Sequence, residues 1–221
     1  MNTHTSNPHE LERLLERSSD LQEALMNLLS DAAFDVSPRA EASLRMCTVA
    51  LEHAMGIRVL MAGGLATSAV GMMRLQFEAL TRSMWLLYAA NEAAISKMLA
   101  PLSPESEHIA KSLPSVSEMI EAIGKRVGKH APAVAYQQLM HFKDVSWHAM
   151  NSYVHGGIHP LRRSADGFPV ALASNILRNS NGLMTMTGMV LAVLTGDEAV
   201  TKPMSRIQAD FADCLPELLK P

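Results

Sequence analysis

Residues 74–88 read RLQFEALTRSMWLLY and form the middle of a long apolar segment. Three charged side chains interrupt this stretch at intervals of four residues: Arg74, Glu78 and Arg82. In an α-helix, positions i, i+4 and i+8 lie on one face, and Trp85 falls within the same stripe. A stripe that contains tryptophan is atypical of a solvated surface. The stretch therefore predicts a central helix whose Arg–Glu–Arg ladder faces inward and forms a buried polar site.

The rest of the chain has the spacing of apolar residues that is typical of amphipathic helices, and proline and glycine residues divide it into segments. The predicted helices are 8–29, capped by Asn7, 39–61, 66–99, 115–127, 132–156, 170–194 and 197–219, the last interrupted at Pro203 and Pro216. Residues 101–114 are predicted to form an exposed loop. Residues 159–163 are predicted to be an extended connector, because a residue before proline avoids the helical conformation.

No segment shows the sustained two-residue alternation of a β-strand, and no repeat of fixed period is present. The segments are joined by short connections, and no linker divides the chain into two cores. We therefore predict an all-α fold, a single antiparallel helical bundle of about six to seven helices over residues 1–221.

Composition narrows the class of protein. The chain has 221 residues and a formal net charge of −3, which argues against broad electrostatic binding to nucleic acid. Its two cysteines, Cys47 and Cys214, lack zinc-site spacing and indicate a reducing compartment. The N-terminus has no apolar signal region, and the apolar stretch 183–194 is too short to span a bilayer. We expect a cytoplasmic protein with no membrane contact.

A second polar stripe lies on the predicted helix 132–156. It comprises His141, Asp144, His148, Asn151, Ser152 and His155. One interpretation is a solvated face between two packed flanks, although such faces more often carry lysine, glutamate and arginine. The other interpretation is a functional site at the end of the stripe, where Ser152 and His155 precede two glycines. Histidines seven residues apart lie about 10.5 Å apart along a helix, so they do not share one ion, and we predict no metal site and no cofactor.

The Arg–Glu–Arg ladder also has two interpretations. It can be a structural device that fixes helix register. Alternatively, two guanidiniums oriented by one carboxylate form an anion site, next to which a histidine acts as general acid or base and a serine as donor or nucleophile. The candidate ligand-binding residues are Arg74, Glu78, Arg82, Trp85, His148, Ser152 and His155. The candidate catalytic residues are Arg74, Ser152 and His155.

The Arg-x-x-x-Glu-x-x-x-Arg helix (Arg74, Glu78, Arg82) and the later Ser-x-x-His helix end (Ser152, His155) resemble those of HEPN-like helical proteins. More narrowly, they resemble a related bacterial family of unknown function. The resemblance implies an antiparallel bundle, often a homodimer, and relatives that bind nucleotides, RNA or partner proteins in bacterial defence. The ribonuclease members use an Arg-x4–6-His motif, and this chain departs from it because neither His148 nor His155 follows an arginine at that spacing.

Three hypotheses follow from these patterns. The first is a binding or regulatory bundle whose polar site holds an anionic, nucleotide- or RNA-like ligand. The second is a metal-independent ribonuclease or toxin-type enzyme that uses His155 with Arg74 and Arg82. The third is a structural homodimeric interaction protein in which the polar residues only fix packing. We expect a homodimer because apolar residues cover several faces of the predicted helices 66–99, 132–156 and 170–194.

Overall fold

The structure is a computed structural model that describes residues 8–104, 108 and 112–217. The predicted cap at Asn7, residues 105–107 and 109–111 of the predicted loop, and residues 218–221 lie outside the described residues. Within the described part of that segment, Pro101, Leu102 and Pro104 are exposed, as expected, but Pro104 and His108 are helical, which the prediction of a loop did not include.

The described residues are helical almost throughout, which confirms the all-α prediction. Their helices are α1 (Pro8–Leu29), α2 (Pro38–Ala62), α3 (Ala66–Tyr88), α4 (Glu92–Leu99), α6 (Val116–Gly124), α7 (Ala133–Val154), α8 (Ile158–Asp166), α9 (Val170–Thr195), α10 (Glu198–Asp210) and the 3-10 helix Ala212–Cys214. These nine α-helices in the described ranges exceed the predicted six to seven. The difference arises in two places, where α3 and α4 separate and where α8 forms.

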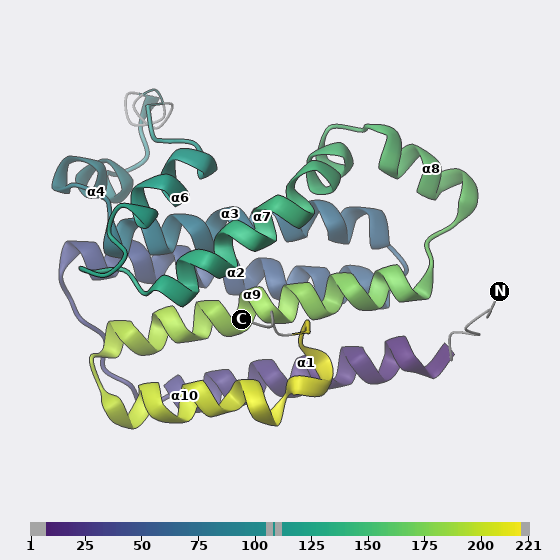
Figure 1. The fold of residues 1–221 in the computed structure, drawn as a ribbon, viewed down its shortest axis with the longest axis horizontal. Coiled ribbons are helices and arrows are strands. Elements are labelled where there is room, and N and C mark those ends of the chain that lie inside the picture. The colour runs from purple at the N-terminus through teal and green to yellow at the C-terminus, as the bar shows by residue number, and fades with distance from the viewer. Residues whose placement is uncertain (1–7, 105–107, 109–111, 218–221) are drawn as a thin grey trace.

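Figure 1 shows how the helices are arranged in space. α1 and α10 lie along one side of the molecule, and α9 packs on both of them. α2 and α9 then cover α3, and α6 and α7 pack on α3 as well. α4 and α8 lie at opposite ends of the molecule, on the side away from α1 and α10. One continuous core of buried apolar side chains runs through this arrangement, and α3 is enclosed by four other helices.

α3 ends at Tyr88, so the prediction of one helix over residues 66–99 was wrong. The amide groups of Ala89 and Ala90 both donate to the Trp85 carbonyl, at 2.9 Å and 2.8 Å, which closes the last turn. The Asn91 side chain then caps α4 by accepting a hydrogen bond of 2.9 Å from the Ala94 amide. An asparagine at this position favours a new helix start over continuation, because its side-chain oxygen satisfies an amide that would otherwise be free.

Residues 159–163 belong to α8, so the predicted extended connector was also wrong. Pro160 is the third residue of this helix. At such a position the amide has no carbonyl partner within the helix, so a proline removes nothing. Pro203 likewise does not interrupt α10, because Val200, Met204 and Ile207 are buried and hold the helix against the core. α10 ends at Asp210, earlier than the predicted helix 197–219, and a short 3-10 helix at Ala212–Cys214 follows it. Leu215, the residue before Pro216, is extended.

Buried polar side chains tie the central helices together. Gln76 on α3 donates to the Ser180 carbonyl on α9 at 2.9 Å, and the Ser180 hydroxyl donates to the Gln76 side-chain oxygen at 2.7 Å. Asn181 donates to the Ser18 hydroxyl and to the Cys214 carbonyl, both at 2.8 Å. Because buried polar groups are costly when unpaired, these contacts specify one register for α1, α3 and α9.

The segment 183–194 is part of the buried helix α9, as expected. Among the described residues, none of the helices has the length and apolar content that crossing a membrane requires. Both cysteines are free and buried, and burial raises the pKa of Cys47 to about 12 and that of Cys214 to about 11. Neither thiol is therefore an activated nucleophile at neutral pH.

Two glycines in the middle of helices provide a matched test of this packing. A Cβ atom on Gly188 of α9 would lie 2.8 Å from Leu25 Cδ2 of α1, whereas one on Gly56 of α2 would lie 3.7 Å from its nearest neighbour, Met72 Cγ. We expect Gly188→Ala to lower the free energy of unfolding by about 1–3 kcal/mol through overpacking. Gly56→Ala should raise it by about 0.5–1 kcal/mol, because alanine favours the helix.

Urea denaturation of the two variants and the unmodified chain measures both effects. If Gly188→Ala were as stable as Gly56→Ala, the close packing of α1 on α9 would be contradicted.

Candidate functional site

The structure brings α3 and the end of α7 together around Arg74. Its Nε donates to Glu78 Oε1 at 2.7 Å, and one terminal nitrogen lies 3.2 Å from His155 Nε2. Its guanidinium carbon lies 4.8 Å from the centre of the Trp147 ring. The Arg74 side chain is 18% exposed and that of Glu78 is 23% exposed, so solvent reaches the pair. Arg74 is thus held on three sides while part of it stays accessible.

Helix geometry explains this convergence. Arg74 and Glu78 are neighbours on one face of α3 because they are four residues apart. Trp147, Asn151 and His155 have the same spacing along α7, so they also form one stripe. α7 ends at Val154, and His155 forms its cap, with its amide donating to the Asn151 carbonyl at 3.0 Å. We call the group of Arg74, Glu78, Trp147, Asn151 and His155 the Arg74 site.

Asn151 adds an unusual feature to the Arg74 site. Its side-chain oxygen is buried and has no hydrogen-bond partner. It lies one helical turn from Trp147 and one turn from His155, and Arg74 contacts both of those residues. A buried acceptor or amide without a partner costs free energy, and such groups are often found where a ligand or water completes the bonding.

Arg82 does not join the ion pair. The only ion pair that Glu78 makes among the described residues is with Arg74, and the Nε of Arg82 is buried without a hydrogen-bond partner. The predicted Arg–Glu–Arg ladder is therefore a single Arg74–Glu78 ion pair. The Glu78 carboxylate turns towards Arg74 and does not contact the Arg82 guanidinium. Trp85, predicted to line the site, is 5% exposed and belongs to the apolar core.

Ser152 lies in the last turn of α7, directly before the turn that leads to α8. Its hydroxyl oxygen accepts a hydrogen bond of 3.1 Å from the His159 amide. A Cβ atom on Gly157 would lie 2.5 Å from this oxygen, so only glycine fits there, while Gly156 has a φ of +65° and lets the chain reverse. We interpret Ser152 as a residue that holds this turn and positions His155. Its predicted role as a nucleophile rests on the sequence alone.

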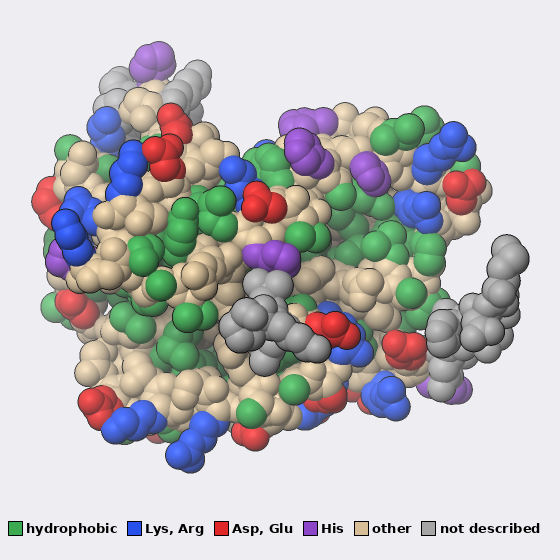
Figure 2. All heavy atoms as spheres, in the orientation of Figure 1, with side chains coloured by type: hydrophobic (Ala, Val, Ile, Leu, Met, Phe, Trp, Pro, Cys, Tyr) green, Lys and Arg blue, Asp and Glu red, His purple; other side chains and the backbone are tan. Residues whose placement is uncertain are grey.

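His148 lies apart from His155 and lines an open hollow of about 370 Å³ between α6 and α7. The hollow, which we call the α6–α7 hollow, is lined by Ser117, Lys143, Asp144, Trp147 and His148. His141 is exposed about two turns before His148. Figure 2 shows histidine side chains gathered on the surface where α7 leads into α8. Within the described ranges, no three histidine, cysteine or acidic side chains are grouped closely enough to bind a metal ion.

Trp147 belongs to the site although it is not among the predicted site residues. Its ring contacts the Arg74 guanidinium and the Phe77 ring, the latter at 6.2 Å between centroids. The signal was present, because Trp147, Asn151 and His155 repeat at i, i+4 and i+8 as Arg74, Glu78 and Arg82 do. Stacking of tryptophan on arginine is favourable and orients the guanidinium.

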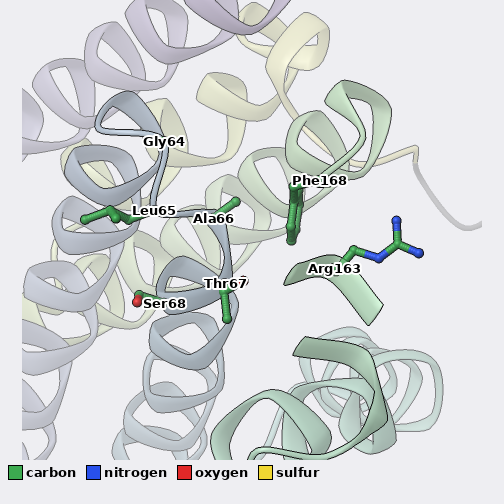
Figure 3. Close-up of a pocket in the computed structure, with 7 residues that line it drawn as sticks. All are labelled: Gly64, Leu65, Ala66, Thr67, Ser68, Arg163 and Phe168. Carbon is green, nitrogen blue, oxygen red and sulfur yellow. The ribbon is translucent and has the colours of Figure 1, made fainter. Parts of the chain in front are cut away.

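A second hollow of about 320 Å³ lies at the start of α3, where residues 64–68 meet Arg163 and Phe168. In Figure 3 the Arg163 guanidinium points away from Thr67 and Ser68. One of its nitrogens donates to the Gly167 carbonyl at 3.4 Å instead. No charged group of this hollow therefore points into it, and it is a poorer candidate than the Arg74 site.

Comparison with known proteins places the chain in a family. The model of DUF6988, a family of unknown function, matches residues 47–217. The chain belongs to this family. The matched DUF6988 region contains all of α3, α7 and α8, and with them the whole Arg74 site. No curated protein and no solved structure matches the chain. The HEPN-like resemblance stays a prediction.

The different surroundings of Glu78 and Arg82 predict different effects on stability. Glu78→Gln removes the carboxylate that Arg74 contacts in a partly buried place, and we expect it to lower the free energy of unfolding by about 1–2 kcal/mol. Arg82→Met removes a buried donor that has no partner, so we expect a change of less than about 1 kcal/mol.

Chemical denaturation of both variants tests this ranking. A loss for Arg82→Met as large as that for Glu78→Gln would show that Arg82 has a strong partner after all.

Proposed function

We propose that this DUF6988 protein is a cytoplasmic binding or regulatory protein that holds an anionic, nucleotide- or RNA-like ligand at the Arg74 site. The observation that carries the proposal is the Arg74 guanidinium, which Glu78 and Trp147 orient and which lies 3.2 Å from exposed His155. A preorganised guanidinium that stays partly accessible is the arrangement by which proteins bind phosphate and carboxylate groups.

The bonding capacity of Arg74 supports this proposal. A guanidinium carries several N–H donors in a planar fork. Glu78 accepts from Nε, and His155 is next to one terminal nitrogen, so the other terminal nitrogen is available to an incoming oxygen. His155 offers a second ring nitrogen, and Asn151, one helical turn before His155, has a buried side-chain oxygen without a partner. A phosphate would accept hydrogen bonds from the N–H donors of Arg74, and a hydroxyl of the ligand or a water molecule would donate one to the Asn151 oxygen.

The unused donors of Arg74 also favour an anion. The Arg74 site contains one guanidinium and one carboxylate, Arg74 and Glu78, so it has no formal excess of either charge. Its attraction for an anion comes from the N–H donors of Arg74 that Glu78 does not use, in a partly buried place where electrostatic attraction is stronger than in water. The whole chain has a formal net charge of −3, so attraction of anions is a property of this site and not of the surface at large.

A metal-independent ribonuclease or toxin-type enzyme is the second candidate. One observation favours it, because exposed His155 next to Arg74 pairs a potential general acid–base group with a group that stabilises negative charge. The hydroxyl of Ser152 is engaged with the His159 amide, which makes it a weaker candidate for a nucleophile. The expected result is therefore binding, and cleavage of bound RNA would favour the enzyme.

Binding of a labelled single-stranded RNA, measured by fluorescence anisotropy with inorganic phosphate as competitor, tests the proposal. We expect Arg74→Gln to weaken binding by about tenfold or more, because charge-assisted hydrogen bonds contribute on the order of 1.5–3 kcal/mol. His155→Gln, which changes an exposed side chain, should weaken binding without loss of stability. A gel of the same RNA shows whether it is cut.

Arg13→Gln is the matched control, because Arg13 is an exposed arginine on α1, outside the Arg74 site. Equal affinity of the Arg74 and Arg13 variants for RNA and for phosphate would exclude the Arg74 site as the place of binding.

The proposal includes a homodimer formed through α8 and the end of α7. No residue of α8 is buried, and Ile158 and Leu161 are 63% and 70% exposed. Val154 at the end of α7 is exposed beside them in sequence. Figure 1 shows α8 projecting from one end of the molecule. A short helix with an uncovered apolar face gains stability when a second copy covers it, and the interface would border His155.

Light scattering after size-exclusion chromatography tests the dimer. We expect the unmodified chain to be dimeric and Leu161→Glu to be monomeric, because a charge would be buried in the interface. Val36→Glu, at a 93% exposed position between α1 and α2, is the control and should leave the mass unchanged. A monomeric unmodified chain would rule the dimer out.

A further inference from the structure

The α6–α7 hollow shares one residue with the Arg74 site. Trp147 lines the hollow, and its ring centre lies 4.8 Å from the Arg74 guanidinium carbon. Along α7, Lys143 precedes Trp147 by one turn, whereas Asn151 follows it by one turn. Trp147 therefore borders both the hollow and the guanidinium at which the anion is proposed to bind.

The side chains of the hollow have a mixed hydrogen-bonding character. Lys143 is a donor and Asp144 an acceptor, while Ser117 and His148 each offer both functions. The formal charges of Lys143 and Asp144 cancel, so the hollow selects neither sign of charge. Hydroxyl groups suit such a set, because each hydroxyl donates one hydrogen bond and accepts others.

Trp147 supplies the remaining contact. Trp147 is the aromatic residue among those that line the hollow, and an indole offers apolar surface against which a ring of similar size can pack. The volume of about 370 Å³ is within the range of small-molecule pockets and holds a group the size of a monosaccharide. Apolar surface on one side and mixed donors and acceptors around it match a hydroxylated ring.

We infer that the α6–α7 hollow is a second subsite for the same ligand, and that this ligand is a hydroxylated ring bearing an anionic group, such as a sugar phosphate. The anion binds at Arg74 and His155, and the ring packs on Trp147 with its hydroxyls towards Lys143, Asp144, Ser117 and His148. The inference rests on the proposed anion site and names the chemical class of its ligand. A free sugar phosphate and the ribose phosphate of a nucleotide share this chemistry.

Calorimetric titration with inorganic phosphate, ribose, ribose-5-phosphate and adenosine monophosphate tests the inference. We expect ribose-5-phosphate to bind about five- to tenfold more tightly than phosphate, because one or two additional hydrogen bonds contribute a factor of that order. Ribose alone should bind much more weakly than ribose-5-phosphate. Adenosine monophosphate binding more tightly than ribose-5-phosphate would identify a nucleotide as the source, and equal or weaker binding a sugar phosphate; both results support the shared chemistry.

Variants separate the two subsites. Lys143→Ala and Asp144→Ala should abolish the advantage of ribose-5-phosphate and leave the affinity for phosphate within about twofold, because they remove only ring contacts. Lys129→Ala and Asp31→Ala change exposed residues elsewhere and are the matched controls.

The possible failures differ. If phosphate binds in an Arg74-dependent way but ribose-5-phosphate binds no more tightly, the second subsite is overturned and the proposed function stands. If the advantage of ribose-5-phosphate survives in both hollow variants, the hollow is likewise overturned as its origin. If neither compound shows binding that depends on Arg74, the proposed function is overturned, and this inference with it.

Discussion

The enclosure of α3 is the constraint on which the rest of the structure depends. α2, α6, α7 and α9 all pack on it, so a charged side chain on α3 has little access to bulk water. A buried charge is costly unless it is paired or hydrogen-bonded. Arg74 meets this requirement through Glu78 on its own helix and through Trp147 and His155 on α7. The contacts of this one charge therefore join α7 to α3, beside the apolar packing of Leu139 and Met150 of α7 in the core.

The same constraint is met differently along α3. Gln76 is fully buried and satisfied by Ser180 of α9, on the side of α3 that faces the centre of the core. Arg74 lies on the side towards α7 and keeps 18% of its side chain exposed. Gln76 is thus fully satisfied, whereas Arg74 stays partly accessible and Asn151 has a buried oxygen without a partner. Unsatisfied buried polar atoms also occur at Thr81, Arg82 and Ser174, so what distinguishes the Arg74 site is that its arginine remains accessible to solvent.

Local chemistry supports the site from the α7–α8 turn. Gly156 supplies the left-handed backbone conformation, Gly157 leaves room for the Ser152 hydroxyl, and that hydroxyl binds the His159 amide. The imidazole of His155 is held at the helix end, where it faces Arg74 and remains exposed. α8 begins directly afterwards with its apolar residues uncovered. The ligand site and the proposed dimer surface consequently lie next to each other in this DUF6988 protein.

The sequence by itself determined the helical class, most helix limits and the two polar stripes, because apolar periodicity, prolines and capping residues act within a few residues of one another. It placed Arg74, Glu78 and His155 among the site residues for the same reason. It missed the end of α3 at Tyr88 and the formation of α8. In the first case a local cap at Asn91 competes with a continuous helical pattern, and in the second a proline in the first turn is compatible with a helix. The sequence left open whether Glu78 pairs with Arg74 or with Arg82, which are equally distant from it along one helix, and it did not show that the His159 amide donates to Ser152; both contacts are local. Only the tertiary structure decided that Trp147 and His155 meet Arg74 while Trp85 lies in the core. Those outcomes depend on how α7 is rotated and placed against α3, and that placement results from packing over the whole core, which no short stretch of sequence contains.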